Sequence, residues 1–204
     1  MRIRTSEKKA APPTGSGDAR SDFITYERYL RDIEEKVKSR HWKDADVRWN
    51  YHQAAAQLLL LAGIRTSDRI LELGTMGIQV FAGSDTLDYT AADWPTFKPT
   101  YFHDARKVPW PIADGSYDTF IALRVFQHLS PAQRACFLEA RRIARRALIV
   151  VPEKYNPKIY KESRGITTED FIAWNDGVAP TFSVKLADSM GMMHYWHYDR
   201  FTGA

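Results

Sequence analysis

Charged residues and glycines recur at the ends of three apolar segments, where they could bind one polar ligand. Glu72 lies at the end of the first segment, before a turn that contains Gly74 and Gly77. Asp88 ends the second segment, and Asp104 follows the third. Glycine lacks a Cβ, so the backbone can turn tightly and approach a ligand closely. A carboxylate only accepts hydrogen bonds, so these acids suit the hydroxyl donors of a ribose and the amine of an adenine.

The apolar patterns around these residues predict the strands that position them. The predicted strands cover, in chain order, residues 69–73, 86–89, 100–103, 117–123 and 147–151. Parallel strands present their carboxyl ends along one edge of a sheet, so the acids and the glycine turn would face one crevice. The glycine turn also has a plainer interpretation, as a tight turn with no ligand.

Apolar residues at three- and four-residue spacing predict the helices. We expect helices over residues 26–37 and 47–62, a third that begins at Ser130, and a fourth that opens at Thr167. Two further strands would lie on either side of Gly191. Strands that alternate with helices predict an α/β fold. Its core would be a doubly wound, mostly parallel Rossmann-like sheet with helices on both faces and an antiparallel C-terminal strand.

Length and composition fit one folded domain. The chain has 204 residues, of which 44% are hydrophobic, enough for one sizeable core. Residues 1–22 are basic and almost free of apolar side chains, so we expect a disordered tail. The single domain would span residues 23–204. It would comprise N-terminal helices (23–66), a ligand-binding core (67–152), and a last segment with the final strands (153–204).

Charge and cysteine content exclude several kinds of protein. The formal charge is +4, with acids interleaved among the bases, so nothing indicates a nucleic-acid partner. One cysteine, Cys136, allows no internal disulfide, and the six histidines show no metal-ligand spacing, so we predict no metal. The longest apolar run, residues 54–62, is too short to cross a bilayer. With no secretory signal evident, we predict a cytoplasmic protein without a membrane partner.

Three passages, taken in order, resemble the class I S-adenosylmethionine-dependent methyltransferases, in particular a small type-11-like domain. Residues 70–77, ILELGTMG, are similar to the family's first glycine motif. Residues 103–111, HDARKVPWP, followed by DGSYD at 114–118, resemble the passage D-A-x-x-L-P-F…D-x-S-F-D. Residues 126–129, FQHL, resemble the x-E-H-L that follows the fourth strand. The resemblance spans residues 69–152, and its middle passage is the most specific.

The resemblance implies S-adenosylmethionine as the cofactor and a role for each matching residue. Asp88 would accept from the ribose, with Tyr89 beside the adenine, and Asp104 and Ala105 would meet the adenine edge. The remaining implied cofactor residues are Glu72, Gly74, Thr75 and Gly77 around the methionine portion, and Leu123 and Arg124 near the sulfonium.

The chain departs from the family pattern in three places. Met76 replaces the middle glycine of the first motif, and Gln127 stands where an acid is common. The span from Gly77 to Asp88 is too short for a full crossover helix. These departures leave room for weak cofactor binding or for a fold that has lost the activity.

Methyl transfer needs an aligned acceptor and, for a hydroxyl or amine, a base. His128 is the candidate base, and a structural histidine at a helix start is the alternative interpretation. His194 and His197 could line an acceptor site. The expected acceptor is a small molecule, such as a sugar or secondary metabolite, methylated on oxygen or nitrogen. The sequence leaves the oligomeric state open, with a homodimer among the options.

Two other classes remain to be weighed. The first is a catalytically weak or inactive module that keeps the methyltransferase fold and binds a protein partner. The second is a nicotinamide-dependent oxidoreductase, which would need a G-x-G-x-x-G turn opening a full helix, and residues 74–83 do not supply one.

Overall fold

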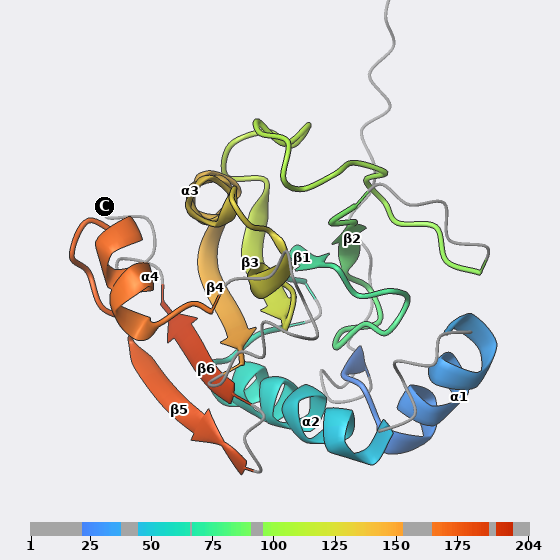
Figure 1. Cartoon of the computed structure of the whole chain (residues 1–204). Helices are drawn as coiled ribbons and strands as arrows, with labels where there is room; N and C mark the ends of the chain where they lie inside the picture. Colours follow the sequence, from blue (N-terminus) through green and yellow to red (C-terminus); the bar gives the residue numbers. More distant parts are fainter. Residues whose placement is uncertain are drawn as a thin grey trace, which may run out of the picture.

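A six-stranded sheet organises the chain in a computed structural model (Figure 1). The structure describes residues 22–37, 45–65, 67–90, 96–152, 165–187 and 191–197. The strands are β1 (Ile70–Leu73), β2 (Asp85–Leu87), β3 (Tyr117–Leu123), β4 (Ala144–Val151), β5 (Phe182–Leu186) and β6 (Gly191–Trp196). Most of the predicted basic tail, residues 1–21, and residues 153–164 of the last segment lie outside the described residues.

The strand order is β2-β1-β3-β4-β6-β5. Strands β2, β1, β3 and β4 are parallel, while β6 runs antiparallel to both of its neighbours, β4 and β5. Residues 146–151 of β4 are all buried, as expected for a central parallel strand covered on both faces. The predicted mostly parallel sheet with an antiparallel C-terminal strand is therefore confirmed.

Helices cover both faces of the sheet (Figure 1). α1 (Tyr26–Lys36) and α2 (Ala45–Leu61) pack on one face, and α3 (Gln133–Ile143) and α4 (Thr168–Trp174) pack on the other. A short 3₁₀ helix, η3 (Phe126–His128), follows β3. α2 ends as predicted at Gly63, whose φ is +74° and whose N–H donates to the carbonyl of Leu60. Among the described residues, none of these helices is both long and apolar enough to cross a bilayer.

Two predicted elements differ from the structure. α3 begins at Gln133 rather than at Ser130, because the chain is still turning out of η3, and the N–H of Ala132 donates to the carbonyl of Leu129. The predicted strand over residues 100–103 is reduced to one parallel bridge between Tyr101 and Leu87. The N–H of His103 then folds back to the carbonyl of Tyr101, which stops further pairing.

The connection between β1 and β2, residues 74–84, contains no helix, as predicted from its length. Its apolar residues Ile78, Val80 and Phe81 pack on the face of the sheet that α1 and α2 cover. The start of the described chain pairs with it: the N–H of Ile24 donates to the carbonyl of Val80 over 2.8 Å. Phe23 forms an antiparallel bridge with Phe81. The N-terminal segment therefore covers the part of the sheet that a crossover helix would cover.

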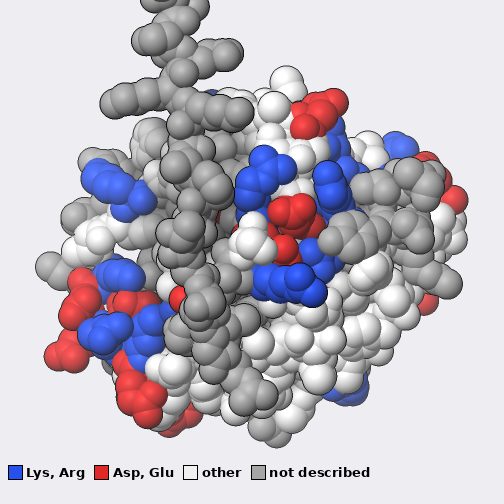
Figure 2. All heavy atoms as spheres, turned by 180° about the vertical axis from the view of Figure 1, so that it is seen from behind, with Lys and Arg blue, Asp and Glu red and all other residues white. Residues whose placement is uncertain are grey.

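Acidic and basic side chains lie next to one another on the face seen in Figure 2. The ion pairs of the described residues include Arg146 with Asp68, at 2.9 Å, and Arg142 with Asp114, at 2.6 Å. Over the part of this face that the described residues form, the two signs of charge are interspersed rather than gathered into one basic surface.

Candidate functional site

The turn after β1 meets the residues that follow β2 and β3. The N–H of Gly74 donates to the carbonyl of Leu87 over 2.9 Å. A Cβ built on Gly74 would lie 2.6 Å from the side chain of Val125 and 3.3 Å from the ring of Tyr89. Glycine at this position lets both side chains close on the turn. The structure therefore brings the carboxyl ends of the three strands together, as their parallel order requires.

The turn itself is held in left-handed backbone conformations. The φ angles are +68° at Gly74, +51° at Met76 and +92° at Gly77. For Met76, which carries a Cβ, this conformation costs about 1–2 kcal/mol. The hydroxyl of Thr75 accepts from the N–H of Gly77 over 3.2 Å. Lys36 of α1 lies against the turn, and its ammonium donates to the carbonyl of Gly77 over 3.4 Å.

Glu72 is buried on the opposite face of β1 from Leu71 and Leu73, on the α1 and α2 side. Its carboxylate accepts from the N–H groups of Val80 and Phe81, both at 2.9 Å, and from Ser84 Oγ, at 2.7 Å. Burial raises the pKa of Glu72 to about 7, although these hydrogen bonds oppose the shift. Its contacts order the connection between β1 and β2, so Glu72 supports the turn from behind.

Asp88 follows β2 and is 3% exposed. Its Oδ1 accepts from the N–H of Tyr89, at 2.7 Å, and from that of Thr90, at 3.4 Å. These bonds fix the carboxylate at the sheet edge and hold the backbone of Tyr89 and Thr90. The hydroxyl of Thr90 is buried and has no hydrogen-bond partner among the described residues.

Asp104 forms an ion pair with Arg106, which was not among the predicted site residues. Arg106 Nε and Nη2 donate to the two carboxylate oxygens of Asp104, each over 2.9 Å. These bonds hold the pKa of Asp104 below its usual value. Ala105 is fully buried, and its carbonyl accepts from Trp110 Nε1 at 2.8 Å and from Cys136 Sγ at 3.1 Å. The signal for this pair in the sequence is the opposite charge of Asp104 and Arg106, which are only two positions apart.

The exit from β3 turns through Arg124. Its φ is +56°, its N–H donates to the carbonyl of Val150, and its own carbonyl accepts from Gln127 Nε2 over 2.6 Å. The guanidinium lies 5.9 Å from the ring centroid of Tyr51 in α2, a cation–π arrangement. Leu123, the last residue of β3, is half-buried against the α2 side of the sheet. Both predicted residues therefore lie where β3 faces α2.

His128 lies beside Tyr89, with the two rings stacked at a centroid distance of 6.0 Å. Gln127 Nε2 lies 3.1 Å from His128 Nε2. Because an amide nitrogen only donates, His128 Nε2 accepts, and the neutral imidazole carries its proton on Nδ1. The other end of the amide, Gln127 Oε1, is buried without a hydrogen-bond partner among the described residues. His128, Tyr89 and Gln127 thus meet at the same sheet edge as Asp88.

The C-terminal histidines lie elsewhere. His194 of β6 is fully buried against Phe171 and Trp196, and burial lowers its pKa to about 4. Its Nδ1 lies 2.8 Å from Ser183 Oγ on β5. The exposed His197 follows β6, and its N–H donates to Thr181 Oγ1. Within the described ranges, no three His, Cys, Asp or Glu side chains are grouped so as to hold a metal ion.

The arrangement is that of the class I S-adenosylmethionine-dependent methyltransferase fold, which confirms the resemblance at the level of the fold. No protein-family model and no curated protein matches the sequence. Magnesium protoporphyrin IX methyltransferase from Synechocystis PCC 6803 with bound SAH superimposes with a TM-score of 0.53 at 15% identity, over 83% of this chain and 91% of that one. The same enzyme with bound SAM gives 0.51 at 14% identity, over 89% and 97%. A SAM-dependent methyltransferase from Aquifex aeolicus gives 0.50 at 12% identity, over 81% and 96%.

Proposed function

We propose that this protein is an S-adenosylmethionine-dependent methyltransferase that acts on a small-molecule acceptor. The observation that carries the proposal is the meeting of the Gly74 turn, the buried carboxylate of Asp88 and the stacked Tyr89–His128 pair at one sheet edge. It occurs in a fold shared with a methyltransferase that was solved with SAM and with SAH.

The polar groups at this edge fit a nucleoside cofactor. Asp88 supplies a fixed, buried acceptor suited to ribose hydroxyls. Thr90 Oγ1 and Gln127 Oε1 are buried and lack hydrogen-bond partners among the described residues. Buried polar atoms are nearly always paired in folded proteins, so both are positions for a ligand or water to fill.

For the remaining residues we propose the roles that the resemblance implies. Tyr89 packs beside the adenine, while Asp104 and Ala105 meet its edge. Thr75 and Gly77 form the turn around the methionine portion, with Gly74 giving it room and Glu72 supporting it. Leu123 and Arg124 line the side near the sulfonium. The bound cofactor supplies the methyl group as an activated sulfonium, and the chain's own residues align the acceptor with it.

His128 is the proposed base, and its geometry sets a condition. A neutral imidazole accepts a proton only at its unprotonated nitrogen, which here is Nε2. The acceptor's hydroxyl or amine must therefore replace the amide of Gln127 as the hydrogen-bond donor to Nε2. The structural alternative is that Gln127 and Tyr89 simply hold the ring in place.

Calorimetric titration with SAH tests the cofactor site. Asp88→Asn should weaken SAH binding about tenfold or more, because a hydrogen bond to a charged group contributes about 1.5–3 kcal/mol. Asp176→Asn is the matched control: Asp176 is exposed, pairs with Arg141, and lies after α4. Equal affinity of Asp88→Asn and the wild type would remove Asp88 from the site.

The second candidate is a catalytically weak or inactive module that binds a protein partner. It is favoured by Met76 in the turn, by Lys36 against Gly77, and by Arg106 on the carboxylate of Asp104. If the folded wild type binds neither SAM nor SAH at millimolar concentration, the methyltransferase proposal fails and this candidate replaces it.

A further inference from the structure

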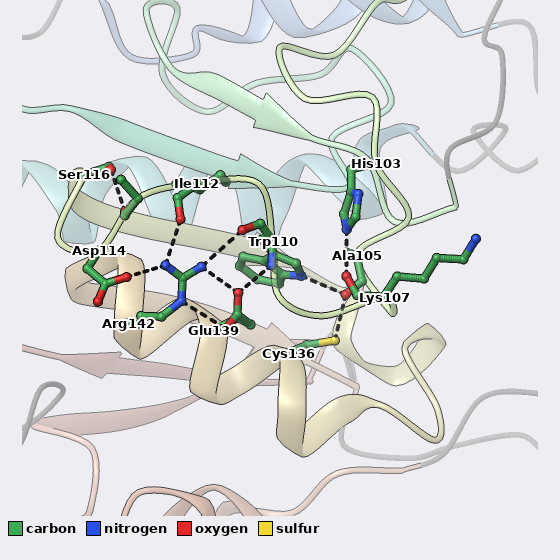
Figure 3. A network of polar contacts seen from close by, with 11 residues as sticks. His103, Ala105, Lys107, Trp110, Ile112, Asp114, Ser116, Cys136, Glu139 and Arg142 are labelled. Atoms are coloured by element: carbon green, nitrogen blue, oxygen red, sulfur yellow. Dashed lines mark hydrogen bonds and ion pairs between the residues drawn. The ribbon is translucent and has the colours of Figure 1, made fainter.

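Helix α3 holds the irregular segment that follows Asp104 (Figure 3). Arg142 Nη1 donates to the carbonyl of Ile112 at 2.7 Å and pairs with Asp114 at 2.6 Å. Glu139, one helical turn earlier, accepts from the N–H of Trp110 at 2.6 Å and from Arg142 Nη2 at 2.7 Å. We call Glu139 and Arg142 the α3 clamp, because together they fix the backbone around Trp110.

Trp110 carries this restraint to Ala105. Its indole N–H donates to the carbonyl of Ala105 over 2.8 Å, and its ring stacks on Phe120 at a centroid distance of 5.9 Å. Cys136 Sγ, also on α3, donates to the same carbonyl over 3.1 Å. Trp110 and Ala105 are both buried, so both contacts lie in the core. A carbonyl has two lone pairs, and this one has both occupied.

The orientation of the Ala105 carbonyl determines that of the next N–H. A peptide unit is planar, so fixing its C=O also fixes its N–H, which belongs to Arg106. That N–H donates to Asp104 Oδ1 over 3.1 Å. The Arg106 guanidinium then holds both oxygens of the same carboxylate. A continuous series of contacts runs from the α3 clamp through Trp110 and Ala105 to Asp104.

We propose that Trp110, fixed by the α3 clamp, is a positioning residue that orients Asp104 to accept a hydrogen bond from the exocyclic amine of the adenine. The inference rests on the proposed function, since it needs a bound adenosyl cofactor. Arg106 leaves Asp104 able to accept, because each carboxylate oxygen has two lone pairs. In this proposal Asp104 selects the amine, and Trp110 acts only by orienting Asp104.

Binding of two ligands distinguishes a loss of Asp104 positioning from a general loss of protein stability. SAH carries the adenine amine, and S-inosylhomocysteine has a carbonyl oxygen in its place. The wild type should bind SAH at least tenfold more tightly. Trp110→Phe keeps an aromatic ring beside Phe120 but removes the indole N–H together with part of the buried ring system. SAH affinity should fall about fivefold, from the loss of about one oriented hydrogen bond. Affinity for S-inosylhomocysteine should change less than twofold.

Trp174→Phe is the control, because Trp174 of α4 packs against Phe137 on the same face of the sheet. This substitution should leave both affinities unchanged. If Trp110→Phe does not fold, Glu139→Gln replaces it. This variant too should reduce the ratio of SAH affinity to S-inosylhomocysteine affinity. An unchanged ratio, or equal binding of both ligands by the wild type, overturns the inference while the proposed function stands. A wild type that binds neither ligand removes the proposed function and this inference together.

Discussion

The hydroxyl of Ser84 donates a 2.7 Å hydrogen bond to Oε1 of Glu72, and so ties the residue before β2 to the interior of β1. The N–H groups of Val80 and Phe81 complete the shell around the same carboxylate. Arg28 of α1 donates to the carbonyls of Gln79 and Val80 from the other side. An acid in the sheet and a base on a helix thus shape a connection that has no helix of its own.

The stability of the protein should depend on pH through Glu72. Its pKa in the folded state is raised to about 7 by burial, against about 4.3 in the unfolded chain. This stabilising contribution is fully present below pH ~4.3 and is lost as the pH rises to about 7. Relative to Glu72→Gln, which does not ionise, the wild type should lose about 3 kcal/mol of unfolding free energy between pH 4 and pH 8. Urea unfolding of both proteins across this range measures the difference, and a difference independent of pH would contradict the assignment.

Gly74→Ala should destabilise the fold by about 3 kcal/mol. Its φ of +68° costs a residue with a Cβ about 1–2 kcal/mol, and that Cβ would lie 2.6 Å from Val125. Gly115→Ala is the matched control, because Gly115 has a φ of +60° and nothing within 4 Å of its Cβ position. The control should lose only about 1 kcal/mol in urea unfolding. Equal losses of unfolding free energy at Gly74 and Gly115 would mean that Val125 moves to make room for the added methyl group.

His128→Asn should separate chemistry from binding. Removing a general base lowers the rate of the chemical step about 10²- to 10⁴-fold. The affinity for SAH should fall far less than the rate, because His128 contacts Tyr89 and is assigned no contact with the cofactor itself. The measurement is kcat with an acceptor that supports turnover, alongside SAH titration of the same variant. A variant that keeps its kcat would favour the structural interpretation of His128.

Tyr51 should stabilise the protein through its ring more than through its hydroxyl. Arg124 lies over the ring, while Arg48 Nη1 donates to the hydroxyl over a long 3.4 Å. Tyr51→Phe keeps the ring and should cost less than about 0.5 kcal/mol. Tyr51→Leu also loses the cation–π contact and part of the buried area, so about 2 kcal/mol should be lost. Urea unfolding of the two variants measures these losses. Similar losses for Tyr51→Phe and Tyr51→Leu would mean that the hydroxyl contributes most of the stabilisation.

The strands and helices could be predicted because their patterns are local. The continuous apolar run of β4 and the Gly63 end of α2 are examples. The burial of Glu72 was not part of the prediction, which placed this residue among the acids facing the ligand, although its alternation with Leu71 and Leu73 puts it on the other face of β1. The domain boundaries and the acceptor remain predictions.

Other features depend on contacts between distant residues, which no local pattern encodes. Arg124 meets Tyr51 across the sheet edge, and Trp110 meets Ala105 through the way its loop folds on α3. The lost third strand has a similar cause, because only Tyr101 forms a backbone bridge with β2, while Thr100 bonds to Thr86 through side-chain hydroxyls. Each of these outcomes was decided by tertiary packing rather than by propensity.

The pairing of residues 22–24 with residues 80–82 links the folding of the sheet edge to the start of the chain. Arg28 and Gln79 are 51 positions apart, and bringing such distant segments together costs chain entropy that contacts within a helix avoid. A crossover helix would instead be held by contacts between residues that are close in the sequence. Here the connection that follows β1 is held by residues 22–28 instead, so the shape of the site depends on a segment that lies far from it in the sequence.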